Sequence, residues 1–277
     1  MGKNQCIASH QQCGDEAMEL LLISLLLSIA LVFSPLGLGG GVLFVPILHY
    51  IGGWPLVEAI IASLAMVWMV AMGSSFAHSG EGHANKEIAN AGRMTAVPAA
   101  IVGTILAWLA IEYVSVLVIK VVAALTLIYV IERNLHSSEK VTTGIEDLTK
   151  YKIGCSFGGL ASGLLGIGGG SVYVTVNRRL AGLNIRDAAG TSYLIGIAVV
   201  PVALLSHILI DGTLPDVFHR TGLLAAIIVP ALAFCSAYIG AKSAIKYLPH
   251  SMVKWVFILA VGSSLGRYLW DIFSVLL

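Results

Sequence analysis

Long apolar stretches alternate with short polar connections along almost the whole chain. An apolar run of about 20 residues is long enough to cross a lipid bilayer as a helix. Eight such stretches are present, at roughly 18–50, 55–77, 92–111, 113–132, 152–177, 187–210, 221–243 and 251–273. The pattern therefore predicts an all-α integral membrane protein with about eight transmembrane segments.

Two polar stretches set the boundaries of the predicted domains. Residues 1–17 form a polar N-terminal tail that lacks the apolar core of a signal peptide. Residues 133–151 form a charged linker that contains Arg133, Glu139, Lys140, Glu146, Asp147 and Lys150. We therefore expect a first membrane repeat at 18–132 and a second at 152–277.

A glycine-rich motif occurs once in each half. Gly37-Leu38-Gly39-Gly40-Gly41 recurs as Gly166-Ile167-Gly168-Gly169-Gly170. Residues 34–64 align with residues 163–193 without a gap, at a constant shift of 129. The identical positions are Leu36, Gly37, Gly39, Gly40, Gly41, Val45, Gly53, Ala59 and Ser63 of the first half. Because most of these anchors are glycines rather than common apolar residues, the match indicates an internal duplication.

The two glycine motifs lie inside the first and fifth apolar segments. Each glycine costs about 1 kcal/mol of helix stability relative to alanine, so four in five positions are expected to break the helix. Paired, glycine-broken segments in two halves of a membrane protein point to a transporter's binding site. The alternative is that Gly37-x-x-x-Gly41 and Gly166-x-x-x-Gly170 are small-residue spacings that let helices pack closely. Both roles are compatible.

The relative orientation of the two halves depends on how the broken segments cross the bilayer. Four crossings in each half would make the repeats parallel. If each broken segment is re-entrant, three crossings remain and the repeats are inverted. Segment lengths leave both arrangements open.

Composition agrees with a membrane protein of the cell membrane. The chain has 277 residues, of which 57% are hydrophobic and 11% are charged, whereas soluble domains carry about 25% charged residues. The net charge of +1 provides no basic patch, so no nucleic-acid partner is expected. The expected partners are membrane lipid and a small anionic substrate, and the oligomeric state stays open between a monomer and a homo-oligomer.

Enzyme and cofactor motifs are missing from the sequence. Gly37-x-Gly39 lacks the third glycine of a dinucleotide-binding loop, and no Gly-x4-Gly-Lys-Ser/Thr motif for ATP is present. Cys6, His10 and Cys13 in the tail have the spacing of part of a metal site but supply too few ligands. We therefore expect neither an enzyme nor a bound cofactor or metal.

Polar groups beside the breaks are candidates for binding the anion. A half-helix that starts after each glycine run would direct its free N–H groups at a common point, which favours an anion. The backbone candidates are Gly39, Gly40, Gly41, Gly168, Gly169 and Gly170, and the hydroxyl candidates are Ser63, Thr191 and Ser192. The alternative for these hydroxyls is that they bond carbonyl groups of their own helix.

Two histidines and a set of arginines extend this hypothesis. His78 ends the second segment and His207 lies late in the sixth, where either could take part in proton coupling. An interfacial position is the alternative for each histidine. Arg178, Arg179 and Arg186 follow the second break and could attract anions to its mouth, or could simply mark an interfacial loop.

These motifs together resemble the sulfite exporter family named after TauE and SafE. The resemblance extends over about residues 20–273 and rests on the doubled Gly-x-Gly-Gly-Gly, Val45-Pro46 and Val174-Thr175, the Ala59…Ser63 element and Ala188-x-x-Thr191-Ser192. Thr175 stands where the family has proline, and Ala62 stands where it has threonine. The resemblance implies a permease that exports sulfite or an organosulfonate and is linked to protons. The alternative is a channel or permease for another small solute, such as a carboxylate or a metal ion.

Overall fold

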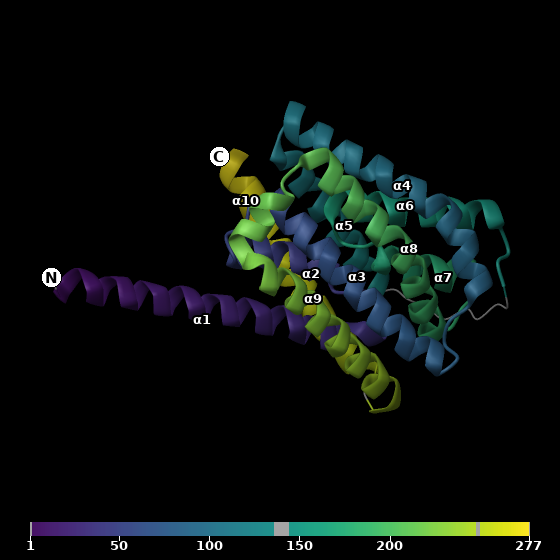
Figure 1. The fold of residues 1–277 in the computed structure, drawn as a ribbon. Coiled ribbons are helices and arrows are strands. Elements are labelled where there is room, and N and C mark those ends of the chain that lie inside the picture. The colour runs from purple at the N-terminus through teal and green to yellow at the C-terminus, as the bar shows by residue number, and fades with distance from the viewer. Residues whose placement is uncertain (1, 136–143, 248–249, 277) are drawn as a thin grey trace.

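The protein is a bundle of helices (Figure 1). A computed structural model describes residues 2–135, 144–247 and 250–276. The first half comprises α1 (Gly2–Phe33), η1 (Ser34–Leu36), α2 (Gly41–Pro46), η2 (Ile47–Ile51), α3 (Leu56–Gly80), α4 (Lys86–Tyr113) and α5 (Val116–Leu135). The second half comprises α6 (Leu148–Leu165), α7 (Gly170–Leu180), α8 (Ile185–Asp211), α9 (Leu214–Tyr247) and α10 (His250–Leu276).

The helices follow the predicted apolar segments closely. The stretch 18–50 is divided between α1 and α2–η2, the stretch 152–177 is divided between α6 and α7, and the other six stretches each form one helix. Helices long and apolar enough to cross a bilayer are found in the described residues at Ala17–Leu36, Leu56–Gly80, Lys86–Tyr113, Ile185–Asp211 and Leu214–Ser243. The prediction of an all-helical protein with several helices able to cross a membrane is therefore confirmed. The count of eight segments stays a prediction.

The two polar stretches are partly helical. Helix α1 begins at Gly2, within the predicted tail, and its first half projects away from the other helices (Figure 1). Helix α6 begins at Leu148 inside the predicted linker, where Asp147 caps it by accepting hydrogen bonds from the N–H groups of Thr149 and Lys150. Residues 136–143 of the linker lie outside the described residues.

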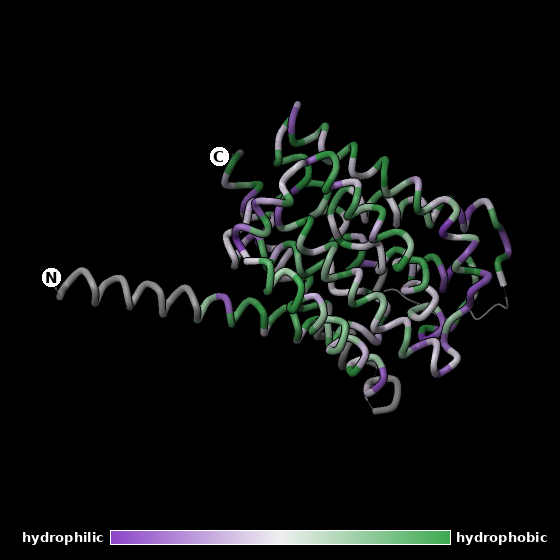
Figure 2. The backbone as a smooth tube through the Cα atoms, in the orientation of Figure 1, coloured by the Kyte–Doolittle hydropathy of each residue, from purple (hydrophilic) through white to green (hydrophobic). Residues whose placement is uncertain are grey.

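Hydropathy along the backbone matches this arrangement. Figure 2 shows that most of the tube is hydrophobic and that hydrophilic residues gather at helix ends and connections. Two of these connections end in asparagine N-caps, Asn85 before α4 and Asn184 before α8, whose side chains accept backbone N–H bonds from the first helical turn.

Each broken segment is a hairpin that folds back on itself. Gly40 at the start of α2 lies against Ile29 near the end of α1, whereas Gly52 after η2 lies against Leu22 much earlier in α1. The second half repeats this geometry, because Gly158 lies against Tyr173 and Gly154 lies against Val176. Both broken segments are therefore helical hairpins, and three long helices follow each of them.

Equivalent helices of the two halves run in opposite directions. The loop after α3 contacts the start of α8, where His83 Nδ1 lies 2.8 Å from Asp187 Oδ1 and the Asn85 N–H donates to Thr191 Oγ1 over 3.0 Å. Because the end of α3 meets the start of its repeat equivalent α8, the repeats are inverted. The structure thus decides an orientation that the sequence leaves open.

The halves interlock rather than form separate bundles. Helix α3 packs on α8 and α9, α4 packs on α6 and α8, and α1 packs on α9. Most of the buried core therefore lies between the halves, and the glycine breaks are at its centre.

Candidate functional site

The helices are interrupted at both glycine motifs. In the first, Gly37, Gly39 and Gly40 have φ values of 76°, 69° and 75°; in the second, Gly166, Gly168 and Gly169 have values of 69°, 74° and 68°. This left-handed region is open to glycine and strained for other residues. The chain needs these six glycines to reverse direction and start α2 and α7.

The two motifs meet face to face in the core. A Cβ atom on Gly41 would lie 2.5 Å from the Ile167 carbonyl oxygen, and one on Gly170 would lie 2.7 Å from the Gly37 carbonyl oxygen. Glycine is therefore required at these positions for close approach of the backbones. The predicted residues Gly39–Gly41 and Gly168–Gly170 are brought together and pack closely, and their role in binding a substrate stays a prediction.

Two of the predicted hydroxyls each form a hydrogen bond with the glycine motif of the opposite half. Ser63 Oγ donates to the Gly166 carbonyl over 2.8 Å, and Ser192 Oγ lies 3.0 Å from the Gly37 carbonyl and 2.8 Å from the Ala189 carbonyl in its own helix. The shift of 129 relates both donors and both glycines, so the pair is reciprocal. In this conformation these hydroxyl hydrogens are directed at backbone carbonyls.

Thr191 lies apart from this reciprocal pair. Its hydroxyl accepts the Asn85 N–H and so joins α8 to the start of α4. The three predicted hydroxyls are all buried close to the breaks, but only Ser63 and Ser192 contact the glycine motifs.

We expect Ser63→Ala to destabilise the protein by about 1 kcal/mol, because it leaves the buried Gly166 carbonyl without its hydroxyl donor. Ser192→Ala is expected to have a similar effect at Gly37. Thermal melting of the purified protein in detergent measures both. Ser206→Ala is the control, since Ser206 bonds only the Val202 carbonyl of its own helix. Melting temperatures that stay at the wild-type value for both variants would contradict the structural role.

Tyr193 is a site residue that the sequence reasoning missed. Its hydroxyl donates to the Ser34 carbonyl over 2.8 Å and accepts the Gly39 N–H over 3.3 Å, so it holds the first break from the opposite half. Its repeat equivalent is Leu64, so the second break lacks this contact. Its position directly after Thr191-Ser192 was the available signal.

The two predicted histidines occupy equivalent positions, because 129 residues separate them. His207 Nε2 donates to the Gly163 carbonyl over 2.6 Å, and Nδ1 lies 2.7 Å from Asp211 Oδ2. His78 is also fully buried, but neither of its ring nitrogens has a hydrogen-bond partner among the described residues. Both histidines are buried, His78 near the end of α3 and His207 near the end of α8.

A small cavity lies between the breaks. Its volume is about 10 Å³, and its walls include Leu38, Gly39, Val67, Ala71, Gly168, Gly170, Ser192, Tyr193, Gly196 and Val200. That volume is about what one water molecule needs. An anion of several atoms enters it only if the two halves move apart, so the structure is a closed state.

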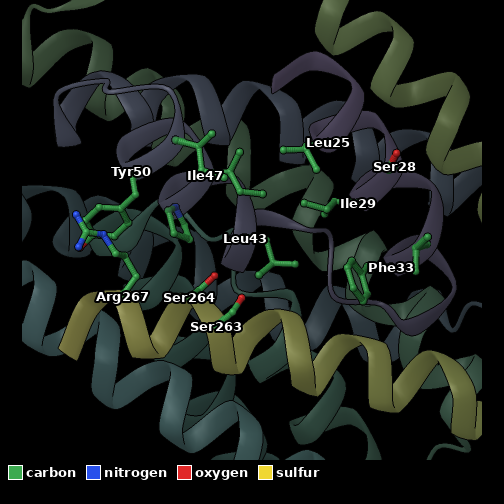
Figure 3. A pocket seen from close by; sticks show the side chains of 13 residues that line it. Leu25, Ser28, Ile29, Phe33, Leu43, Ile47, Tyr50, Ser263, Ser264 and Arg267 are labelled. Atoms are coloured by element: carbon green, nitrogen blue, oxygen red, sulfur yellow. The ribbon is translucent and has the colours of Figure 1, made fainter. Parts of the chain in front are cut away.

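Two larger cavities lie away from the breaks. One of about 540 Å³ lies between α1, α2–η2 and α10, where Arg267 and Tyr50 are at one end and Ser263 and Ser264 follow along α10 (Figure 3). The Arg267 guanidinium lies 4.9 Å from the centre of the Tyr50 ring. The other, of about 370 Å³, is lined mostly by apolar residues of α1, α3, α8 and α9. Neither contains a glycine of the motifs.

Two charged pairs join the halves, one near the start of α3 and one near the start of α8. Glu58 near the start of α3 accepts a hydrogen bond from Arg220 of α9 over 2.9 Å, and the equivalent Asp187 pairs with His83. Among the predicted arginines, Arg179 and Arg186 are exposed at the end of α7 and the start of α8. They are therefore placed at the mouth of the second hairpin.

The described residues contain no group of three or more His, Cys, Asp or Glu side chains that could hold a metal ion. The side chains of Cys6, His10 and Cys13 lie outside the described residues.

Inverted repeats whose broken helices meet inside the membrane are the architecture of a secondary transporter. The protein is a multi-pass membrane protein of the transporter type. It belongs to the sulfite exporter TauE/SafE family, whose sequence profile matches residues 20–268. Comparisons with curated proteins and with solved structures find no match. The family resemblance stated from the glycine motifs is therefore confirmed.

Proposed function

We propose that the protein is a secondary permease that exports a small sulfur-containing anion, such as sulfite or an organosulfonate, across the cell membrane. The observation that carries the proposal is the meeting of the two glycine breaks around the central cavity. Membership of the sulfite exporter family supports the class of substrate.

Eight membrane segments serve this function, of which six cross the bilayer and two are the re-entrant hairpins. The anion lies between the hairpins, near Gly39–Gly41 and Gly168–Gly170. The first N–H groups of α7 have no acceptor within the helix and favour a negative charge. The hydroxyls of Ser63, Thr191 and Ser192 become donors to the anion when the halves separate.

Substrate entry requires the closed cavity to enlarge. The inverted repeats supply two equivalent ways to do this, one towards each side of the membrane, as alternating access requires. Proton coupling in this proposal uses His78 and His207, which are buried at equivalent positions. Their surroundings differ, because His207 has Asp211 as a hydrogen-bond partner and His78 has no such carboxylate partner in the described part of the chain.

Purified protein in proteoliposomes tests the function directly. We expect sulfite loaded inside to exchange with labelled sulfite outside, at a rate well above that of empty liposomes. We also expect sulfite, thiosulfate or a sulfonate to raise the melting temperature of the detergent-solubilised protein, because a ligand of the folded state stabilises it. Stabilisation by a carboxylate or a divalent metal ion, without any by sulfur oxyanions, would refute the proposed substrate class.

A further inference from the structure

Three polar side chains are buried together on one side of the first break. Ser74, His78 and Tyr193 have between 0% and 2% of their surface exposed. Ser74 Oγ and both nitrogens of His78 make no hydrogen bond among the described residues. Buried polar groups in folded proteins nearly always have partners, so adjacent unpartnered ones require an explanation.

These side chains continue the wall of the central cavity. Val67 and Ala71 of α3 line the cavity together with Tyr193, and Ser74 and His78 follow them at positions i+7 and i+11 from Val67, on the same face of the helix. The Ser74 side chain lies beside the Tyr193 hydroxyl, and the rings of His78 and Tyr193 are 5.8 Å apart. A continuous polar strip therefore leads from the cavity towards the end of α3.

The second half provides an internal comparison for this strip. The repeat equivalents of Tyr193 and Ser74 are Leu64 and Ala203, which are apolar. The equivalent of His78 is His207, whose two nitrogens are both occupied. At the equivalent positions of the second half the strip is replaced by two apolar side chains and a histidine with both nitrogens bonded, so the fold itself does not fix polar side chains at these three positions.

Positive and negative groups both surround the outer end of the strip, which is the end at His78. His83, Asp187 and Arg186 are the charged and titratable neighbours that act on His78, and His83 is paired with Asp187. Arg186 is the cation among these neighbours, and because it is exposed its positive charge attracts anions to this end of the strip.

We propose that Ser74, His78 and Tyr193 bind the transported oxyanion as it moves between the central cavity and the end of the membrane domain where Arg186 lies. This inference rests on the proposed function and names contacts that the glycine motifs do not supply. The two hydroxyls and one imidazole N–H are donors placed on one side of a small anion. Ser74 Oγ and the His78 nitrogens lack a hydrogen bond to any described residue in the closed state, and the Tyr193 hydroxyl donates to the anion in place of the Ser34 carbonyl that it bonds here.

Sulfite binding to the purified full-length protein, followed by titration calorimetry, tests this site. We expect Ser74→Ala to weaken sulfite binding about tenfold, since a hydrogen bond to a charged group is lost. The melting temperature without ligand should stay close to the wild-type value, because the Tyr193 hydroxyl beside Ser74 keeps its bond to the Ser34 carbonyl. His78→Leu should weaken binding similarly, whereas His78→Gln should restore part of it by supplying an N–H donor. Tyr193→Phe should lower both affinity and melting temperature, because its hydroxyl also holds the first break.

Ser75→Ala is the matched control. Ser75 is the neighbouring buried serine of α3 but points away from the strip, so its loss should leave sulfite affinity unchanged. Wild-type affinity in both Ser74→Ala and His78→Leu would overturn this inference alone, and so would an equal loss of affinity in Ser75→Ala. A wild-type protein that binds no sulfur oxyanion would overturn the proposed function and this inference together.

Discussion

Replacing Gly41 or Gly170 by alanine is expected to reduce transport to the background of empty liposomes. The added Cβ at Gly41 would meet the Ile167 carbonyl, and at Gly170 it would meet the Gly37 carbonyl. These neighbours are backbone atoms of the opposite hairpin, so they can give way only if the hairpins separate. Overpacking of a core costs about 1–3 kcal/mol, and we expect a loss of stability at the upper end of that range.

Thermal melting and sulfite exchange in proteoliposomes measure the two effects together. Gly262→Ala is the control for a helical glycine of this chain, because a Cβ there meets no described atom within 4 Å. Gly196→Ala is a graded comparison, since its Cβ would point at Ala71 at an ordinary contact distance of 3.7 Å in the cavity wall. Full transport by Gly41→Ala and Gly170→Ala would show that the hairpins need no close contact.

The helix breaks were predictable from the sequence because a run of glycines destabilises a helix locally, whatever residues pack against it. The repeat then indicated which residues would be equivalent, and Ser63 and Ser192 indeed make equivalent contacts with Gly166 and Gly37. Their partners were less predictable. A hydroxyl beside a break can donate to an anion or to a backbone carbonyl. In the closed state, the choice between these two acceptors depends on where the carbonyls of the opposite hairpin lie.

Other features depend on long-range packing and left little trace in the sequence. The inverted orientation follows from α2 and α7 folding back on α1 and α6, which segment length does not reveal. Tyr193 has an apolar equivalent, Leu64, so the repeat gave no reason to select it. Asp211 was missed because its significance arises from its position one helical turn after His207, and such a pair is common on exposed helices as well.

His207 and Asp211 form a buried hydrogen-bonded pair. The Gly163 carbonyl is an acceptor only, so His207 Nε2 donates to it, and Nδ1 lies within hydrogen-bond distance of the Asp211 carboxylate. Their side chains are only 2% and 8% exposed. A change in the charge of this pair is costly in a medium of low polarity unless the site opens or an anion moves. This pair is therefore a suitable place to couple proton movement to transport.

We expect Asp211→Leu to destabilise the protein by about 1–3 kcal/mol, because it leaves a buried histidine nitrogen without its partner. The double variant with His207→Leu should be less destabilised than the single variant, since both buried polar groups are then removed. Thermal melting of the single and double variants measures this coupling. Asp216→Asn, at an exposed position five residues later, should melt at the wild-type temperature.

Asp211→Asn separates proton coupling from stability. The amide keeps a hydrogen-bond acceptor for His207 Nδ1 but cannot carry the charge of a carboxylate. We therefore expect this variant to exchange sulfite across liposomes of equal pH at close to the wild-type rate, while losing accumulation driven by a pH gradient. Accumulation at the wild-type level in Asp211→Asn would show that the coupled proton is held elsewhere. Loss of both exchange and accumulation in a variant that melts at the wild-type temperature would instead assign Asp211 to the movement between open states, because exchange at equal pH needs no net proton transfer.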